Sequence, residues 1–508
     1  FARMPVLAEA GIHTVINGPI TYTMDGAPLV GPIPGKRNAF CIVGLRAGLG
    51  EGGGHGWLLA QQIVHGEALY DTWGIDPRRF AGHANAELTA RKAIEEYQNE
   101  FRFAFPNEHR PAGRPARTTP LTPVLAARGA AFIEVNGWER VEYIKPTADF
   151  RVTHGFGFDE AFDVVAAEVR NVQENVGLCE VSGFNRFEIT GAGRHAFLDR
   201  MLCGNVPRRD GRVGLGYLLN HHGMVKSEAT IANLPAGDRG GERVWYGSAA
   251  AGECHDMDWL SQHLRSGEDV HIRSLTNDQT VLVLAGPRAR DVLSACARGD
   301  WSQQAFPWLS VRECCIGFAP ATVMGISFSG ELAYEVHVPN GALYAAYVAL
   351  CEAGRAHGLN LFGARAVEAM RLEKGFLHWK ADILTEFDPF ETSLGRFVRP
   401  EKGDFIGRDA LLKRRDGGVR KQLVTLKIDA TDAPAHGGAS LTEGDRVVGT
   451  VTSGQWGHRV GMNLAYGFVD PGLAHHGSRM QLDLCGRSVG AEVIAPSPYD
   501  PDHTRMRA

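Results

Sequence analysis

The pattern of hydrophobic and polar positions changes along the chain. From about residue 126 to 415, strand-like runs of alternating residues are followed by short turns and helical stretches, which predicts an α+β domain. Residues 416–508 instead carry short strands separated by Gly and Pro turns, which predicts a small C-terminal β-barrel. Residues 66–125 hold one amphipathic helix candidate, at 87–101, and a Pro- and Arg-rich stretch, so we interpret them as a connector. Together these patterns predict an α+β protein of several domains.

One strand-like run carries a lone acid. The stretch 220–234, NHHGMVKSEATIANL, begins with turn-forming residues and continues in alternation. Because strand side chains alternate with a period of two, Glu228 falls on the same face as Ala232. Ala229 and Ile231 point to the opposite face. Two interpretations stay open: a strand-end acid that leans into water, since Glu is rarely buried, or a base at the floor of a pocket.

A glycine cluster precedes an apolar helical stretch in residues 1–65. The segment RAGLGEGGGHG leads into WLLAQQIVHGE, and we expect the helix to start near Gly56. Glycines before a helix let the backbone come close to a ligand and point free N–H groups at it, with a flexible loop as the alternative. GLGEGG (48–53) satisfies the spacing GxGxxG, but the sequence after the helix does not look like the second strand of a dinucleotide fold. The spacing alone therefore does not predict a dinucleotide site.

Composition and charge narrow the function classes. At 508 residues, and with roughly 150 residues per domain, the chain is expected to form about three domains. The net charge of -5 gives no broad attraction for nucleic acid or an anionic membrane. No apolar run approaches the ~20 residues of a membrane-spanning helix. The nine cysteines are scattered without a CxxC pair, as is typical of reduced thiols, so we expect a cytoplasmic protein.

The sequence lacks the motifs of several common enzyme classes. The sequence has no HExxH, GxSxG or GxxxxGK[ST] motif, which argues against a zinc protease, an α/β-type hydrolase and a P-loop enzyme. The adjacent pairs His221-His222 and His475-His476 fall in predicted turns, where neighbouring histidines are usually solvated. No metal site is therefore expected.

Nine motifs carry a resemblance to a known family. They occur in the order INGPITYTMDGAPLVGP (16–32), GLGEGGGHG (48–56), GWER (137–140), VGLCEVSGFNRFEITG (176–191), YLLNHHGMVKSEATIANL (217–234), SFSGELAYEVHVP (327–339), ARAVEAMRLEKGFLHWKADI (364–383), DFIGRDAL (404–411) and TSGQWGHRVGMNLAYGFV (452–469). With these motifs the sequence resembles the dimethylglycine/sarcosine dehydrogenase and oxidase family. Members of this family join an FAD-dependent amine-oxidising domain to a folate-binding module similar to the glycine-cleavage T-protein. The resemblance covers nearly the whole chain.

The resemblance implies how the chain divides. Residues 1–65 would form the C-terminal part of the FAD-dependent oxidoreductase domain, and 66–125 its central linker. An aminomethyltransferase-like folate domain would follow at 126–415, with the C-terminal barrel at 416–508. The glycines that bind the FAD phosphates, and the His that carries the flavin covalently in many members, would lie before the first residue, on a longer polypeptide or on a second chain.

The resemblance also implies an activity. It is the FAD-dependent oxidative demethylation of a small N-methylated amino acid, with the one-carbon unit released as formaldehyde or captured by tetrahydrofolate. The electron acceptor would be oxygen or an electron-transfer protein, and the compartment the mitochondrial matrix if the source is eukaryotic. Two alternatives stay open: a tetrahydrofolate-dependent aminomethyltransferase, and a non-catalytic folate-binding protein of the same fold. Which amine is the substrate, and whether the enzyme is an oxidase or a dehydrogenase, is left open by the motifs.

Candidate residues for the folate site follow from the resemblance. Glu228, where the family usually has Asp, would accept the proton that leaves a folate nitrogen. Glu335 would accept hydrogen bonds from the amino-pyrimidine edge of the pterin. Phe328 stands where the family usually has Tyr, and the missing hydroxyl is expected to lower folate affinity. Tyr217 would line the same cavity or form half-buried core. Arg371 would meet a folate carboxylate or, alternatively, an acid at a domain interface.

The flavin side and two further positions complete the candidates. Trp379 and Asp382 match family positions and are expected to be structural. The helix dipole behind the glycine cluster would favour negative charge on the reduced flavin ring. The residues expected to face the flavin are Gly52, Gly53, Gly54 and His55.

Overall fold

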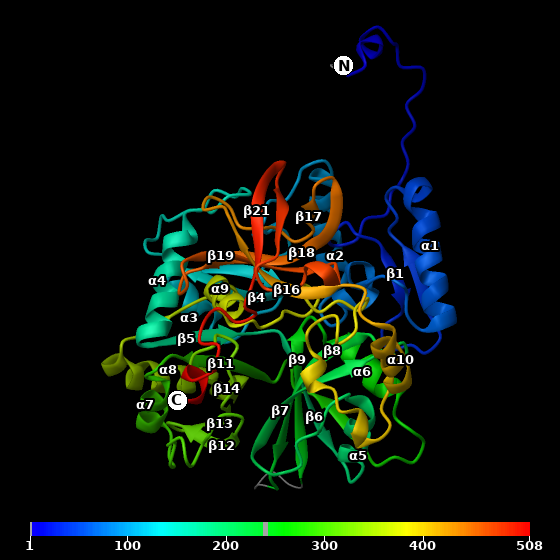
Figure 1. The fold of residues 1–508 in the computed structure, drawn as a ribbon. Coiled ribbons are helices and arrows are strands. Elements are labelled where there is room, and N and C mark those ends of the chain that lie inside the picture. The colour runs from blue at the N-terminus through cyan, green and yellow to red at the C-terminus, as the bar shows by residue number, and fades with distance from the viewer. Residues whose placement is uncertain (1–2, 237–241) are drawn as a thin grey trace.

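The computed structural model describes residues 3–236 and 242–508. Figure 1 shows the N-terminal segments, in blue, along one edge of the molecule. Two lobes that are mostly green lie at the base, and a barrel in orange and red lies above them. The predicted class, an α+β protein with a C-terminal barrel, is confirmed.

The glycine cluster lies inside a helix rather than before it. Strands β1 (Leu29–Pro32) and β2 (Phe40–Val43) form an antiparallel pair, and helix α1 (Gly48–His65) follows them. The expected helix start near Gly56 is therefore wrong, because Gly52 to His55 already lie within α1. Only the first four N–H groups of a helix lack an intrahelical acceptor. The glycines at 52–54 therefore do not supply the free N–H groups that the sequence suggested.

The connector lies between α1 and the first lobe. It contains the short 3-10 helices η2 (Trp73–Ile75) and η3 (Pro77–Phe80), followed by α2 (Ala86–Gln98). The side chain of Asn85 accepts a hydrogen bond from the Leu88 N–H at 3.0 Å and so caps α2. The amphipathic helix expected at 87–101 is thus present, with its start set by this cap, but it ends at Gln98, three residues earlier than expected.

The first lobe is built on a five-stranded antiparallel sheet of order β10-β6-β9-β8-β7. Phe187, Ala229 and Ile231 pack on one face against Phe197 of one helix and Leu260 of another. Ala232 belongs to a different apolar cluster, so the two faces of β8 are those that the alternation predicts. The elements are β6 (Phe184–Thr190), β7 (Arg212–Leu219), β8 (Val225–Leu234), β9 (Arg243–Ala250), β10 (His271–Ser274), α5 (Arg194–Met201) and α6 (Glu253–Gln262).

The second lobe is built on a six-stranded sheet of order β12-β13-β14-β11-β5-β15. Leu282, Leu284 and Val336 pack on one face against Leu350 and Val292 of two helices. The strands are β5 (Val176–Val181), β11 (Gln279–Ala285), β12 (Val311–Ile316), β13 (Ala319–Met324), β14 (Ala333–Pro339) and β15 (Leu359–Leu361). The helices are α7 (Ala289–Cys296) and α8 (Leu343–Gly354), with η4 (Asn340–Ala342) and η5 (Arg355–His357) beside α8.

Helices and a hairpin close the space between the lobes and the barrel. Helix α9 packs against α4, β4 and the barrel strand β18, as its place between lobes and barrel in Figure 1 shows. The elements are α3 (Thr122–Ala127), β3 (Ala130–Val135), β4 (Trp138–Ile144), α4 (Ala161–Glu174), α9 (Ala364–Lys374), η6 (Gly395–Phe397), η7 (Pro400–Lys402) and α10 (Arg408–Gly417).

The C-terminal part is a closed six-stranded barrel of order β16-β19-β18-β17-β20-β21. Its interior holds an apolar cluster that includes Leu426, Leu441 and Leu482. Closure removes unpaired strand edges. The strands are β16 (Gln422–Ile428), β17 (Ser440–Glu443), β18 (Arg446–Gly457), β19 (Met462–Val469), β20 (Arg479–Leu484) and β21 (Arg487–Ile494), with η8 (Pro471–Leu473) in a connection.

Two expectations from composition can be compared with the fold. All nine cysteines are free thiols, as the scattered spacing predicts. Within residues 3–236 and 242–508, no helix combines the length and the apolar character that a membrane crossing requires.

Candidate functional site

The lone acid of β8 is hydrogen-bonded to a tyrosine on the neighbouring strand. Tyr217 of β7 lies directly opposite Glu228, and its hydroxyl donates to Glu228 Oε2 at 2.6 Å. Tyr217 is buried and Glu228 is partly buried. Among the described residues, Glu228 Oε1 has no hydrogen-bond partner, so one oxygen is held and the other is available. The structure thus brings together two residues that the sequence nominated for one site.

Burial sets the protonation of this pair. It raises the pKa of Glu228 to about 7, while the hydrogen bond from Tyr217 lowers that pKa. Burial and the adjacent carboxylate raise the pKa of Tyr217 well above its ordinary value, so the tyrosine stays a donor. A carboxyl group whose pKa lies near neutral pH is suited to accept and return a proton. The geometry therefore supports a proton-transfer role for Glu228 with Tyr217 as its support.

Glu335 lies on the other lobe, in a group of buried polar side chains that lack partners. The Arg186 Nε, the His337 Nδ1 and the Trp245 Nε1 are buried without a hydrogen bond. Glu335 Oε2 is 3.2 Å from His337 Nε2, and the His337 and Trp245 rings are 4.7 Å apart. Buried polar groups normally have partners, so these nitrogens could donate hydrogen bonds to, or accept them from, a polar ligand.

The charges around Glu335 are also incompletely compensated. Burial lowers the pKa of Arg186 to about 10, with Glu335 as the largest opposing charge and Glu180 next. Burial raises the pKa of Glu180 to about 8. Arg186 and Glu335 together offer N–H donors and carboxylate acceptors, the types of group that could bind the polar edge of a heterocycle. Sequence reasoning found Glu335 but missed Arg186, although a charged residue inside a strand-like run was a visible signal.

Phe328 presents an aromatic face. It is 37% exposed, and its ring stacks on Phe376 with centroids 6.0 Å apart and an interplanar angle of 13°. Its exposed side leaves room for further stacking contacts. The position keeps the ring of the tyrosine that the family usually has, without its hydroxyl.

Arg371 is fully engaged by the protein. Its side chain is inaccessible to solvent, and its Nη1 donates to Asp382 at 2.7 Å and to the carbonyl of Phe376 at 3.1 Å. The other N–H groups donate to Glu368 and, at 2.8 Å, to Ser453 of the barrel. Since a guanidinium has five N–H donors, none is left for a folate carboxylate. Of the two interpretations offered by the sequence, the geometry supports the ion pair with an acid.

The ion pairs of Arg371 also give Asp382 a role. Burial alone would lower the pKa of Arg371, but the charges of Glu368 and Asp382 outweigh it and hold that pKa above its ordinary value. Asp382 accepts from Ser453 at 2.7 Å as well, so this acid links α9 to β18. Asp382 is structural, as expected.

The glycine-rich face of α1 is open. Gly48, Gly52 and Gly56 recur at every fourth position and share one face, and a Cβ added at any of them would meet nothing within 4 Å. His55 carries a buried Nδ1 without a partner. A flat group can approach such a face closely because no side chain intervenes. Gly53 and Gly54 have the same open surroundings.

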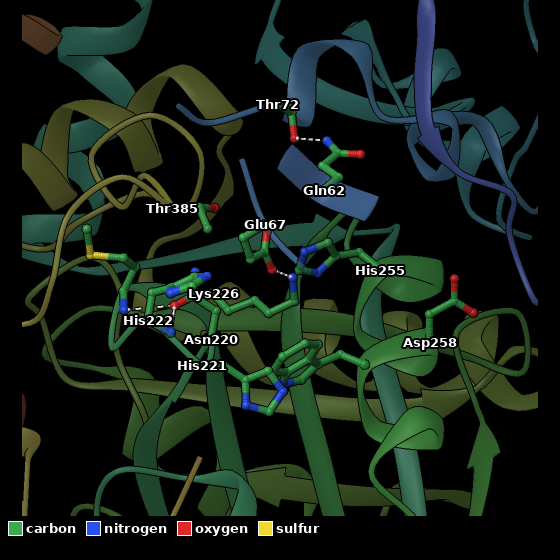
Figure 2. A network of polar contacts seen from close by, with 12 residues as sticks. Gln62, Glu67, Thr72, Asn220, His221, His222, Lys226, His255, Asp258 and Thr385 are labelled. Carbon is green, nitrogen blue, oxygen red and sulfur yellow. Dashed lines mark hydrogen bonds and ion pairs between the residues drawn. The ribbon is translucent and has the colours of Figure 1, made fainter. Parts of the chain in front are cut away.

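The connector docks onto the strand that carries Glu228. Figure 2 shows Glu67 and Lys226 paired at the start of β8, where the pairing register with β7 shifts, and the Lys226 Nζ lies 4.5 Å from the centroid of the Trp259 ring of α6. The ring of Trp73 is 5.7 Å from that of His255 and 5.1 Å from that of Trp379. The connector and the first lobe therefore share a buried contact.

Trp379 and Lys226 are the residues of this contact that bear on the site. The Trp379 Nε1 donates to the Lys226 carbonyl at 3.2 Å, which fixes the backbone beside Glu228. Burial lowers the pKa of Lys226, while Glu67 acts in the opposite direction. Sequence reasoning missed Lys226, although a lysine within an otherwise strand-like run was a visible signal.

Comparisons with known proteins agree with this geometry. The GCVT N-terminal domain family matches residues 121–402, and the glycine cleavage T-protein C-terminal barrel domain matches residues 421–500. The FAD dependent oxidoreductase central domain matches residues 65–119. The first of these families covers more than half of the chain.

Two curated relatives align along almost the whole chain. Mitochondrial dimethylglycine dehydrogenase of Rattus norvegicus is 32% identical over 99% of this chain, which spans 58% of that relative. Mitochondrial sarcosine dehydrogenase of Mus musculus is 29% identical over 99% of this chain, which spans 60% of that relative. The chain thus spans about three fifths of the length of these relatives.

A solved structure shows the same fold. The glycine cleavage system aminomethyltransferase T from Bartonella henselae superposes with a TM-score of 0.65 at 22% identity, over 76% of this chain and 98% of that one. The resemblance to the dimethylglycine/sarcosine dehydrogenase family is confirmed. The chain therefore belongs to the glycine cleavage T-protein family, with the N-terminal domain and the C-terminal barrel of that family joined to the central domain of an FAD-dependent oxidoreductase.

Proposed function

We propose that the protein takes part in the FAD-dependent oxidative demethylation of a small N-methylated amino acid and passes the one-carbon unit to tetrahydrofolate. The observation that carries the second half is the Tyr217–Glu228 pair, a partly buried acid held by a single donor. The first half rests on the match to the FAD dependent oxidoreductase central domain and on the two dehydrogenase relatives. Dimethylglycine and sarcosine are the substrates in the names of those relatives, and an amine of this class is proposed here.

The residues divide the work between two places. When bound, FAD would accept the two electrons lost by the N-methyl group, and tetrahydrofolate would supply the nitrogens that capture the carbon. Glu228 Oε1 accepts the proton that leaves a folate nitrogen, and the Tyr217 hydroxyl holds Oε2 so that the free oxygen keeps its direction. Glu335 and Arg186 would hold the pterin edge through charge-assisted hydrogen bonds. Gly48, Gly52 and Gly56 would face the flavin.

The compartment and the electron acceptor are part of the proposal. Both dehydrogenase relatives are named as mitochondrial, and nine free thiols agree with a reducing compartment such as the mitochondrial matrix or the cytoplasm. Oxygen or an electron-transfer protein would take up the electrons, and a longer polypeptide or a second chain would supply further FAD-binding residues.

Two measurements test the proposal. A visible absorption spectrum of the purified full-length protein is expected to show a flavin, and bleaching of the flavin on addition of dimethylglycine or sarcosine would show that the amine is oxidised. Calorimetric titration with tetrahydrofolate is expected to show binding. A colourless protein that binds tetrahydrofolate would instead favour an aminomethyltransferase, and a protein that binds neither would contradict the proposal.

The pH dependence of methylene-tetrahydrofolate formation should report on Glu228. Because a base must be ionised, the rate is expected to rise tenfold per pH unit up to a midpoint near the pKa of about 7 and then to level off. Tyr217→Phe removes the donor that favours the ionised form, so the midpoint is expected to move to higher pH. The rates would be measured between pH 5.5 and 8.5 at saturating tetrahydrofolate. Tyr344→Phe on the exposed face of α8 is the control, and an equal midpoint in the Tyr217 variant would contradict the assignment.

Substitution of Glu335 tests the pterin contact. Glu335→Gln keeps the shape but removes a charge that faces Arg186, so tetrahydrofolate is expected to bind about tenfold more weakly, as when one charge-assisted hydrogen bond is lost. The dissociation constant would be measured by calorimetry. Glu492→Gln, at an acid on the outer surface of the barrel, is the control. Unchanged affinity in Glu335→Gln would remove this residue from the folate site.

A further inference from the structure

The C-terminal segment leaves the barrel and ends on the second lobe. Strand β21 ends at Ile494, and Figure 1 shows the last residues, in red, beside α8 and β14. Residues 505–507 form the short helix η9. The buried side chain of Met506 lines a small cavity together with Leu332 and Tyr334, and Arg290 Nη2 donates to the Ala508 carbonyl at 2.8 Å. The barrel does not need these contacts, because β21 already pairs with β16 and β20.

The segment supplies two of three donors to one buried acid. Glu331 is 1% exposed and precedes β14 in the loop after β13. Its Oε1 accepts from the Tyr499 hydroxyl at 2.7 Å and from Arg459 Nη1 at 2.8 Å. Its Oε2 accepts from Arg505 Nε at 2.5 Å. A buried carboxylate needs such partners, because it otherwise carries the full cost of desolvation.

The same contacts tie the loop to α9. Arg459, whose Cζ lies 3.8 Å from the Tyr499 ring centroid, also pairs with Glu373 of α9. The next residue of α9, Lys374, is paired with Asp500 at 3.0 Å. The Lys374 side chain also packs closely against this loop. A Cβ added at Gly330, the residue before Glu331, would lie 2.8 Å from the Lys374 side chain. The loop is thereby enclosed by α9, the barrel and the C-terminal segment.

The enclosed loop carries the residues proposed to contact the pterin. Phe328 lies within it, and Glu335 follows it at the start of β14, four residues beyond Glu331. We propose that residues 499–507 position the folate site, with Tyr499 and Arg505 as positioning residues that act through Glu331 on Phe328 and Glu335. This inference rests on the proposed function, because it assigns the segment to the folate step and not to amine oxidation.

Substitutions in the segment separate positioning from folding. Tyr499→Phe removes the hydroxyl and keeps the ring beneath Arg459, and Arg505→Met removes the guanidinium and keeps the length. The matched control is Arg507→Met, because the Arg507 side chain is exposed and lies over Trp308 instead of pairing with Glu331. Each variant of the flavin-loaded protein would be titrated with tetrahydrofolate, assayed for formaldehyde release without folate, and melted.

The expected result is a selective loss. Tetrahydrofolate should bind about tenfold more weakly to Tyr499→Phe and Arg505→Met, in line with the loss of one hydrogen bond to a charged group, while formaldehyde release stays unchanged. Arg505→Lys should recover part of the affinity, and Arg507→Met should bind as the wild type does. If Arg505→Met does not fold, the tetrahydrofolate affinity of Tyr499→Phe tests the proposal on its own.

Two outcomes overturn the inference in distinguishable ways. Lower melting temperatures with unchanged tetrahydrofolate affinity would show that the segment only stabilises the fold. A wild-type protein that does not bind tetrahydrofolate would overturn the proposed folate step itself, and this inference with it.

Discussion

Glu228→Gln is expected to stop methylene-tetrahydrofolate formation while formaldehyde release continues. The amide keeps the size of the side chain and can still accept from Tyr217, but it cannot take up a proton. Since general base catalysis contributes about 10²–10⁴-fold, the folate-dependent rate should fall by that factor. The measurement compares the two products from one amine under identical conditions, with tetrahydrofolate present and absent.

Two further variants sharpen this result. Glu188→Gln changes a partly exposed acid of the same sheet that pairs with Arg243 and Arg273, and neither product should change. Glu228→Asp keeps the charge but moves the oxygens by roughly one bond length, so an intermediate rate is expected, because catalysis is sensitive to shifts of ~1 Å. An unaltered yield of methylene-tetrahydrofolate in Glu228→Gln would remove Glu228 from the mechanism.

Arg371→Met is expected to cause the largest loss of stability. The variant leaves Asp382 buried without its cation, and removal of one partner of a buried pair costs about 3–5 kcal/mol. Urea unfolding followed by circular dichroism should shift to lower denaturant, and the barrel should separate from α9 first because Ser453 loses a donor.

An exposed arginine on the same barrel strand as Ser453 serves as the control. Arg446 and Glu443 are more than half exposed, and loss of such a pair costs about 0–1 kcal/mol, so Arg446→Met should unfold nearly as the wild type does. If Arg371→Met were as stable as Arg446→Met, the buried network would not hold the barrel to α9.

The sequence predicted local features well. The faces of β8 follow from alternation alone, because each side chain in a strand has only two directions. The barrel follows from short strands at turn-rich spacing. Both predictions depend on neighbours along the chain, and both are confirmed by the structure.

Two other features depend on distant residues and were not predictable. Glycine disfavours helices, so the start of α1 was placed after the cluster, yet the helix extends back to Gly48. The environment of Arg371 is decided by Ser453, which lies far along the chain on the barrel. The three donors around Glu331 come from two segments far along the chain for the same reason. Sequence motifs named some site residues, but their partners are set by tertiary contacts.

The docked connector has a consequence for how the polypeptide can be divided. The Trp73 ring packs against the rings of His255 and Trp379, and Glu67 is paired with Lys226. Residues 101–104, in contrast, are exposed. A break in the covalent backbone at 101–104 would leave these side-chain contacts intact. Two separately made pieces that meet at this point would retain the surface by which they recognise each other, so the same architecture is compatible with one polypeptide or with two subunits.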